Sequence, residues 1–283
     1  MGDVKKTRIS VIGAGALGGA VARGLTKAGC KVLVTGAHPE RLGELKADGI
    51  RLISDNAKAI EDGEVVMFAL KPHIILGVAE EYAGLLRGKP CISLATAVTL
   101  GLLKQAAPEA RWARAMTNLS AALNCAFTGI TKSEETTGDD LAWMMDAFEL
   151  LGETVEVEEK NLDALTALAA SAPAFFVTLM EALAMGGIYT GLPKDLAYRG
   201  AMSAMLGAAR LSMTSGKHPA TLRDDVCTPG GVTIEGIYEI ERAGARATLM
   251  KAIILTAEKV KVLTEEISAS SQKQSKTHSQ RGI

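Results

Sequence analysis

The chain has 283 residues, a length that allows one large α/β unit or two smaller domains, each with its own core. Hydrophobic residues make up 48% and charged residues 22%, which excludes a chain that is disordered throughout. Lys and Arg total 31 against 32 Asp and Glu, and this balance argues against a nucleic-acid or anionic-membrane surface. We therefore expect small molecules or further copies of the chain as partners.

Apolar runs alternate with amphipathic ones from residue 8 to about residue 157. The expected strands are residues 9–12, 32–34, 50–53, 65–70, 91–95 and 112–116, with mainly helical segments between them. Such alternation is typical of a parallel sheet covered by helices, and the largely apolar strands indicate a sheet buried on both faces. We predict an α/β domain over residues 1–158.

The first expected strand leads directly into the sequence GAGALG and then into an amphipathic segment. Strand, GxGxxG and helix in this order form the signature of a Rossmann-type dinucleotide-binding domain. Gly13 allows the tight turn, Gly15 lets the backbone approach a pyrophosphate, and Gly18 permits close packing of the helix on the strand. Free N–H groups at the helix start, at Ala16 and Leu17, would face the phosphates. The alternative is a glycine-rich turn that binds nothing.

The second expected strand ends in VTGAH, residues 34–38, without the carboxylate that an NAD site usually places on the ribose 2′-hydroxyl. Thr35, His38 and Arg41 could instead donate to a 2′-phosphate. NADPH is therefore the expected cofactor, with NADH as the alternative. Arg41 has a second interpretation, as a solvated residue on the next helix.

Further cofactor contacts are expected where the third and fourth strands end, because an open α/β fold binds ligands at that edge of the sheet. Asn56 follows the third strand, and Ala69, Lys71 and Pro72 follow the fourth within the sequence ALKP. Two of these residues have structural alternatives. Asn56 would cap the following turn, and Pro72 would open the next helix.

The chain changes character after residue 158, where Ala, Leu and Met recur at helical spacing without a convincing strand. We predict an all-helical domain over residues 159–267. Its helices carry more apolar surface than so small a bundle can cover, so we expect part of it to be buried against a second copy. Residues 268–283 are rich in Ser, Gln and Lys and are predicted to form a disordered tail.

The sequence DDVCTPGGVT precedes a helix that is expected to start near residue 234. The backbone N–H groups of this turn and the hydroxyls of Thr228 and Thr233 would form a seat for a substrate carboxylate. The alternative is a turn followed by a helix that a threonine caps.

With this turn the chain resembles the Δ1-pyrroline-5-carboxylate reductase family. The resemblance rests on IGAGALGGA, on ALKP, on residues 165–184, on the turn GLP and above all on HPATLRDDVCTPGGVTIEGIYEIE, and it covers nearly everything except the tail. It implies NAD(P)H-dependent reduction of the cyclic imine Δ1-pyrroline-5-carboxylate to L-proline, the last step of proline biosynthesis. It also implies a homodimer, or a ring of dimers, formed through the helical domains.

The resemblance assigns roles to residues of the turn. Thr233 is expected beside the imine nitrogen or the carboxylate as a hydrogen-bonding catalytic group, because a hydroxyl is a poor acid. The backbone of the preceding residues is expected to bind the carboxylate; these residues are Thr228, Gly230, Gly231 and Val232.

The chain departs from the family pattern at three segments. The family's MPNTP appears as MTNLS, which keeps Met116 and Asn118, and its GSGPAY appears as ASAPAF, which keeps Ser171 and Pro173. We expect Asn118 to contact the cofactor and Ser171 to contact a ligand, with helix capping as the alternative for Ser171. Pro173 should interrupt a helical pattern over residues 162–184 and free backbone groups there. The segment LATA, residues 94–97, lacks the glycine expected after the fifth strand.

Other functions are weighed against an imine reductase. A β-hydroxyacid dehydrogenase needs a lysine acid/base at the start of the long helix, and residues 169–176 contain none. A sensor that binds NADP(H) without turnover, or a reductase of a related cyclic imino acid, is the alternative.

The cysteines and the apolar stretches indicate whether the chain binds metal and where it is located. The four cysteines lie far apart, without a CxxC pair or a histidine at ligand spacing, which predicts reduced thiols and no metal site. The first ten residues lack the apolar core of a signal peptide, and the longest apolar stretches are interrupted short of about 18 residues. We therefore expect a soluble, cytoplasmic protein.

Overall fold

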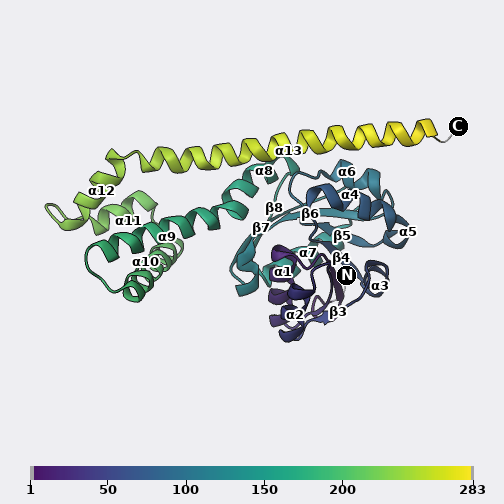
Figure 1. The fold of residues 1–283 in the computed structure, drawn as a ribbon, viewed down its shortest axis with the longest axis horizontal. Helices are drawn as coiled ribbons and strands as arrows, with labels where there is room; N and C mark the ends of the chain where they lie inside the picture. The colour runs from purple at the N-terminus through teal and green to yellow at the C-terminus, as the bar shows by residue number, and fades with distance from the viewer. Residues whose placement is uncertain (1–2, 282–283) are drawn as a thin grey trace. The chain divides into compact units, whose positions relative to one another are not determined.

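The computed structural model describes residues 3–281, and it describes their side chains except at residues 39, 41 and 273–281. The chain forms two compact units, Met1–Ser171 with Thr256–Ile283, and Ala172–Leu255. The first unit holds a sheet with its helices, and the second is all helical (Figure 1). The division into compact units falls after Ser171, and the end of the last helix belongs to the first unit. The domain boundary at residue 158 stays a prediction.

The sheet has eight strands in the order β3-β2-β1-β4-β5-β6-β7-β8. Their bounds are β1 Arg8–Ile12, β2 Lys31–Thr35, β3 Arg51–Leu52, β4 Val65–Phe68, β5 Pro90–Ser93, β6 Arg111–Met116, β7 Ala126–Lys132 and β8 Gly152–Glu156. Strands β1 to β6 are parallel, and their order reverses between β1 and β4. This doubly wound arrangement confirms the predicted α/β class and the six predicted strands.

The last two strands, β7 and β8, were not predicted, and β7 runs antiparallel to β6. The sheet is therefore parallel except for this one pair. A search for apolar runs misses these strands because β7 buries threonines among its aliphatic residues and β8 has no fully buried residue. Thr128 is fully buried on β7, and its hydroxyl donates to Thr117 Oγ1 at 2.9 Å.

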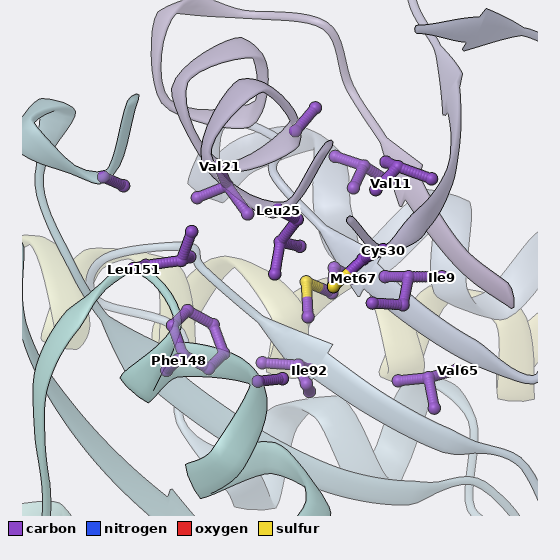
Figure 2. Close-up of a cluster of buried hydrophobic side chains, with 14 of the residues drawn as sticks. Ile9, Val11, Val21, Leu25, Cys30, Val65, Met67, Ile92, Phe148 and Leu151 are labelled. Atoms are coloured by element: carbon purple, nitrogen blue, oxygen red, sulfur yellow. The ribbon is translucent and has the colours of Figure 1, made fainter. Parts of the chain in front are cut away.

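Helices cover both faces of the sheet, which accounts for its apolar strands. The helices of the first unit are α1 Ala16–Lys27, α2 Pro39–Ala47, α3 Asn56–Asp62, α4 Pro72–Glu81, α5 Ala83–Leu86, α6 Leu100–Ala106 and α7 Gly138–Glu149, with short 3-10 turns η1 Leu119–Leu123 and η2 Glu159–Asn161. One core joins Leu25 of α1 and Phe148 of α7 to Ile9 and Ile92 of the sheet (Figure 2). A second core, on α3 to α6, contains Trp112.

The helical run that follows the sheet changes its geometry before it enters the second unit. It begins as α8 Leu162–Leu165, widens into the π-helical segment η3 Thr166–Ser171, and continues as α9 Ala172–Tyr189. Pro173 has no N–H group for the carbonyl of Ala169, four residues earlier, and Asn118 Nδ2 donates to that carbonyl at 2.9 Å. The freed backbone group is confirmed, whereas the predicted interruption is not, because the helix widens before Pro173 and continues.

The second unit contains α9 to α12 and the start of α13, as the prediction of an all-helical region required. The further helices are α10 Lys194–Ser215, α11 Pro219–Val226, α12 Val232–Arg242 and α13 Ala245–Arg281. The later part of α13 belongs to the first unit, where Val260 is buried and Ile267 packs against the second core. The helix therefore continues past residue 268, where the tail was expected to begin, and disorder of that end stays a prediction.

Large apolar side chains are exposed throughout the second unit. They include Tyr189 at 93%, Met213 at 77% and Val232 at 91% exposure. The continuous helical run Glu159–Tyr189 is long and apolar enough to span a membrane by length and composition. That run was missed in the sequence, where apolar stretches were judged too short. The excess of apolar surface agrees with the expectation for this region.

Candidate functional site

The glycine-rich turn after β1 needs glycine for two different reasons. Gly13 has φ +111°, and a Cβ atom there would lie 2.6 Å from the carbonyl oxygen of Ala69. A Cβ atom at Gly18 would lie 2.0 Å from the carbonyl oxygen of Gly13. As the sequence predicted, Gly13 makes the turn and Gly18 lets α1 pack closely against it.

The amino-terminal end of α1 is open. Gly15 is its N-cap, no side chain caps it, and its first turn contains no acidic residue. The N–H groups of Ala16 and Leu17 therefore have no partner within the helix. A hollow of about 250 Å³ lies at this end, lined by Ala14, Gly15, Ala16, Gly19, Arg23, Glu44 and Leu45. Free donors at the positive end of a helix fit a phosphate group.

The ends of β2 and β3 bring together two predicted cofactor residues. Thr35 Oγ1 donates to Asn56 Oδ1 at 2.7 Å. Because its oxygen is occupied in this way, Asn56 has its Nδ2 hydrogens left to donate to a ligand. Asp55, and not Asn56, is the N-cap of α3, since its carboxylate accepts the N–H of Lys58 at 2.8 Å. The capping alternative for Asn56 was therefore wrong.

Gly36 directly follows β2, where the sequence lacks the carboxylate of a usual NAD site, and the structure gives a packing reason for glycine there. A Cβ atom at Gly36 would lie 2.5 Å from the Cβ of Ala14, so no side chain fits there without moving the glycine-rich turn. An acidic residue is thus excluded at this point by packing. His38 is exposed, with Nδ1 3.6 Å from Glu40 Oε1, and the side chain of Arg41 lies outside the described residues.

The segment after β4 stays close to the same turn. The N–H of Ala69 donates to the carbonyl of Ile12 at 2.9 Å, which continues the pairing of β4 with β1. Lys71 is exposed and forms the N-cap of α4, and Pro72 is the first residue of that helix. The structural alternative for Pro72 is confirmed. Contact of Ala69, Lys71 and Pro72 with a dinucleotide stays a prediction.

The turn between α11 and α12, in the second unit, has an open helix start of its own. Gly231 is the N-cap of α12 without a side-chain cap, so the alternative of a capping threonine was wrong. Gly230 has φ +70°, and a Cβ atom at Gly231 would lie 2.4 Å from Thr228 Oγ1. The backbone N–H groups of Val232 and Thr233 lie in the first turn of α12, where they lack helical partners.

Thr233 also lines a largely apolar hollow of about 470 Å³ within the second unit. The other residues of its wall are Ala208, Leu211, Ser212, Pro219, Leu222, Arg223, Val226, Cys227 and Ile237. A hydroxyl and free N–H groups beside an apolar wall suit a small ring that carries a carboxylate.

Comparison with known proteins gives a consistent result for both units. Residues 159–263 match the family model described as pyrroline-5-carboxylate reductase dimerisation, and residues 8–97 match NADP oxidoreductase coenzyme F420-dependent. Pyrroline-5-carboxylate reductase of Pisum sativum is 34% identical over 261 residues, which cover 90% of this chain and 96% of that protein. The chain belongs to the pyrroline-5-carboxylate reductase family.

Solved structures related to this reductase family share the fold. Pyrroline carboxylate reductase of Plasmodium falciparum, solved with NADP bound, has a TM-score of 0.85 at 22% identity and covers 93% of this chain and 100% of that chain. Pyrroline-5-carboxylate reductase of Coxiella burnetii has a TM-score of 0.81 at 29% identity, with 91% and 98% covered. The chain therefore spans nearly the full length of these reductases.

Ala97 and Asn118 lie in two segments where the sequence departs from the reductase pattern. Ala97 is buried and has φ +65°, so an alanine occupies the left-handed position where a glycine was expected. Asn118 uses its Oδ1 to accept the N–H of Ser120 at 2.9 Å and its Nδ2 to hold the Ala169 carbonyl. Asn118 thus has a structural role that was not predicted, and its contact with the cofactor stays a prediction.

Ser171 and the four cysteines give little further information on ligand binding. Ser171 is half-buried at the end of η3, inside a continuous helical run, so it does not occupy a helix start as the capping alternative supposed. The four cysteines are unpaired, and burial raises the pKa of the thiols of Cys30 and Cys91.

Proposed function

We propose that this protein reduces Δ1-pyrroline-5-carboxylate to L-proline, with NADPH as the reductant, and that it acts as a cytoplasmic homodimer. The observation that carries the proposal is the 34% identity to a curated pyrroline-5-carboxylate reductase over 90% of the chain. The open helix starts at Gly15 and Gly231 agree with it, because the cofactor and the substrate are both anions.

The first unit supplies the cofactor side of the reaction. The N–H groups of Ala16 and Leu17 would hold the pyrophosphate, and Asn56 Nδ2 would donate to the adenosine ribose or its phosphate. The absence of a carboxylate at Gly36 favours NADPH, with NADH as the less favoured alternative. When bound, the reduced nicotinamide supplies a hydride to the ring carbon of the C=N bond.

The second unit supplies the substrate side. The N–H groups at the start of α12, with Thr228, Gly230 and Gly231, would bind the carboxylate, and the Thr233 hydroxyl would hydrogen-bond to the imine nitrogen or the carboxylate. A C=N carbon is strongly electrophilic once its nitrogen is protonated. The hydride then completes the amine without a further proton, so the residues need mainly to orient the ring.

The exposed apolar surface of the second unit supports the proposed dimer. Side chains such as Tyr189, Met213 and Val232 are more exposed than a soluble monomer of this size tolerates in such number. A second copy packed on this surface would bury them and would also account for the apolar run Glu159–Tyr189 without a membrane. Cytoplasmic localisation is proposed for a biosynthetic enzyme with unpaired cysteines.

The decisive experiment mixes the purified chain with NADPH and Δ1-pyrroline-5-carboxylate and follows the absorbance of reduced nicotinamide. We expect oxidation of NADPH with formation of proline, and slower oxidation when NADH replaces NADPH. Binding of NADPH without oxidation would overturn the proposal in favour of a sensor. Faster turnover of a six-membered cyclic imino acid would instead identify a related substrate.

A further inference from the structure

A buried cation lies just below the carboxyl edge of the sheet, and the proposed reaction does not use it. Arg114 is on β6, its side chain is 3% exposed, and it is paired with Ser93, the last residue of β5. Because removing a guanidinium from water is costly, a charge at such a place requires a specific partner.

The partner of Arg114 is a carboxylate that also holds a second element. Arg114 Nη1 donates to Glu159 Oε1 at 2.8 Å, and the same oxygen accepts the backbone N–H of Leu100 at 2.7 Å. Glu159 begins η2, which leads into α8, and Leu100 begins α6. One carboxylate therefore joins β6, the start of α6 and the start of the helical run into η3.

The guanidinium depends on this single carboxylate. Its Nε is buried and has no hydrogen-bond partner in the structure. Among the described residues, Glu159 is the only side chain that forms a hydrogen bond with Arg114. Since a buried ion pair of this kind is rarely stabilising in itself, its geometry points to a role in fixing the elements that it joins.

Those elements frame one half of the predicted dinucleotide site. The loop over residues 94–99 connects β5 to α6 and ends at Leu100, and its Thr96 lies with Oγ1 4.0 Å from Met116 Sδ at the end of β6. In a doubly wound sheet the two halves of a dinucleotide lie on either side of the switch point. The adenosine half belongs to the side of Thr35 and Asn56, so the nicotinamide half belongs to the side of β5 and β6.

Resting on the proposed reductase function, we propose that Arg114 is a positioning residue for the nicotinamide half of the site. It acts through Glu159, which holds the β5–α6 loop and the helical run at the carboxyl edge of the sheet. Among the described residues, Arg114 and Glu159 form no hydrogen bond with the start of α1 or with the Thr35–Asn56 pair, so we expect both to keep their geometry when the network is broken.

The test separates the two halves of the cofactor. NADPH contains both halves, whereas 2′,5′-ADP contains only the adenosine half with its 2′-phosphate. Arg114→Met removes the cation, Arg114→Lys keeps a cation that can reach Glu159, and Glu159→Gln keeps an acceptor for both donors. Arg111→Met is the matched control, because Arg111 lies on the same strand and donates to the buried Asp140 at 2.6 Å, but at the opposite end of β6.

We expect Arg114→Met to lower kcat and to weaken NADPH binding by about tenfold each, with 2′,5′-ADP binding changed by less than about twofold. Arg114→Lys and Glu159→Gln should recover part of kcat, and Arg111→Met should lower the melting temperature without this split. Should Arg114→Met fail to fold, the two conservative variants are expected to show the same split at smaller size.

Equal losses of NADPH and 2′,5′-ADP affinity would overturn the proposal, as would an unchanged kcat or the same split in Arg111→Met. The binding measurements do not depend on the identity of the imine. If the unmodified chain bound NADPH but did not oxidise it with Δ1-pyrroline-5-carboxylate, the reductase function would fail, and the two affinities would still decide the role of Arg114.

Discussion

The two units of this chain bury their apolar residues in different ways. In the first unit the sheet has a core on each face, and large side chains such as Phe68, Trp112 and Phe148 are completely buried. In the second unit only Ala172, Ala184, Ala197 and Ala201 are buried among the hydrophobic residues, and larger apolar side chains are exposed. The first unit therefore has the core of an independent fold, whereas the second needs another surface to cover it.

The largest expected effect concerns that missing surface. Met213→Glu places a charge on a side chain that is 77% exposed in the single chain, whereas Ile74→Glu does the same at 41% exposure on α4 of the first unit. We expect Met213→Glu to convert the proposed dimer to a monomer in sedimentation, because a buried unpaired charge costs several kcal/mol at an interface. Ile74→Glu should leave the dimer intact. Dimers of both variants would contradict the interface proposed for α10.

A buried ion pair gives the next largest effect, in the first unit. Asp140 is buried on α7, accepts two hydrogen bonds from Arg111 and forms a capping box with Thr137. We expect Asp140→Ala to lower the free energy of unfolding by about 3 kcal/mol in urea denaturation. The loss should not depend on protein concentration if the first unit is stable by itself.

The same carboxylate predicts a pH dependence. Burial opposes ionisation of Asp140, but hydrogen bonds from Arg111 and Thr137 outweigh it and lower the pKa of the carboxyl group. Its contribution to stability is therefore complete above the ordinary Asp pKa of about 3.9 and is lost as the pH falls through the lower folded-state pKa. Urea denaturation of the native chain and of Asp140→Asn should converge as the pH falls below about 4.

The fourth prediction compares chemistry, assigned to the second unit, with cofactor binding, assigned to the first. Thr233→Ala removes one hydroxyl from the start of α12, and we expect kcat to fall by about 10- to 100-fold. NADPH affinity, which belongs to the first unit, should change little. Thr233→Ser should keep most of the turnover because it retains the hydroxyl. A parallel loss of NADPH affinity in Thr233→Ala would show that this residue has been placed in the wrong half of the reaction.

The smallest effect is a gain in stability at Ala97. Its φ of +65° is a conformation that costs a residue with a Cβ atom about 1–2 kcal/mol. We expect Ala97→Gly to raise the free energy of unfolding by about 0.5–1 kcal/mol, since the more flexible unfolded chain offsets part of the relief. Thermal denaturation checks this change, and Ala95→Gly, at a buried alanine whose φ is not positive, should be destabilising.

Sequence patterns predicted the parts of the molecule where local chemistry decides the structure. The run from β1 through Gly13 and Gly18 into α1 was predicted residue by residue, because only glycine fits those two positions. The glycine expected after β5 is missing from residues 94–97, and only the structure identifies Ala97 as the residue with a left-handed conformation. The α12 turn was found from its free N–H groups, although its N-cap proved to be Gly231 and not a threonine.

The sequence was less informative where distant residues complete one another. Strands β7 and β8 were missed because they pair with each other, with buried threonines on β7 and no buried residue on β8, and apolar periodicity gives no signal for either. The contact of Asn118 with Ala169 and that of Arg114 with Glu159 join segments that only the folded chain brings together. Ile267 is followed by mostly polar residues, so nothing in this stretch predicts that it packs against the second core of the first unit.

Residues 118 and 173 are remote in the chain, but both determine whether the carbonyl of Ala169 has a hydrogen-bond donor. The effect of a substitution at one of them therefore depends on the other. With proline at 173 it receives its hydrogen bond from Asn118, so an alanine at 118 would leave a backbone oxygen unsatisfied. With alanine at 173 a backbone donor would be restored within the helix, and the amide at 118 would become dispensable to that oxygen. The cost of changing either residue thus depends on the other, and exchange at these two sites is expected to be non-additive.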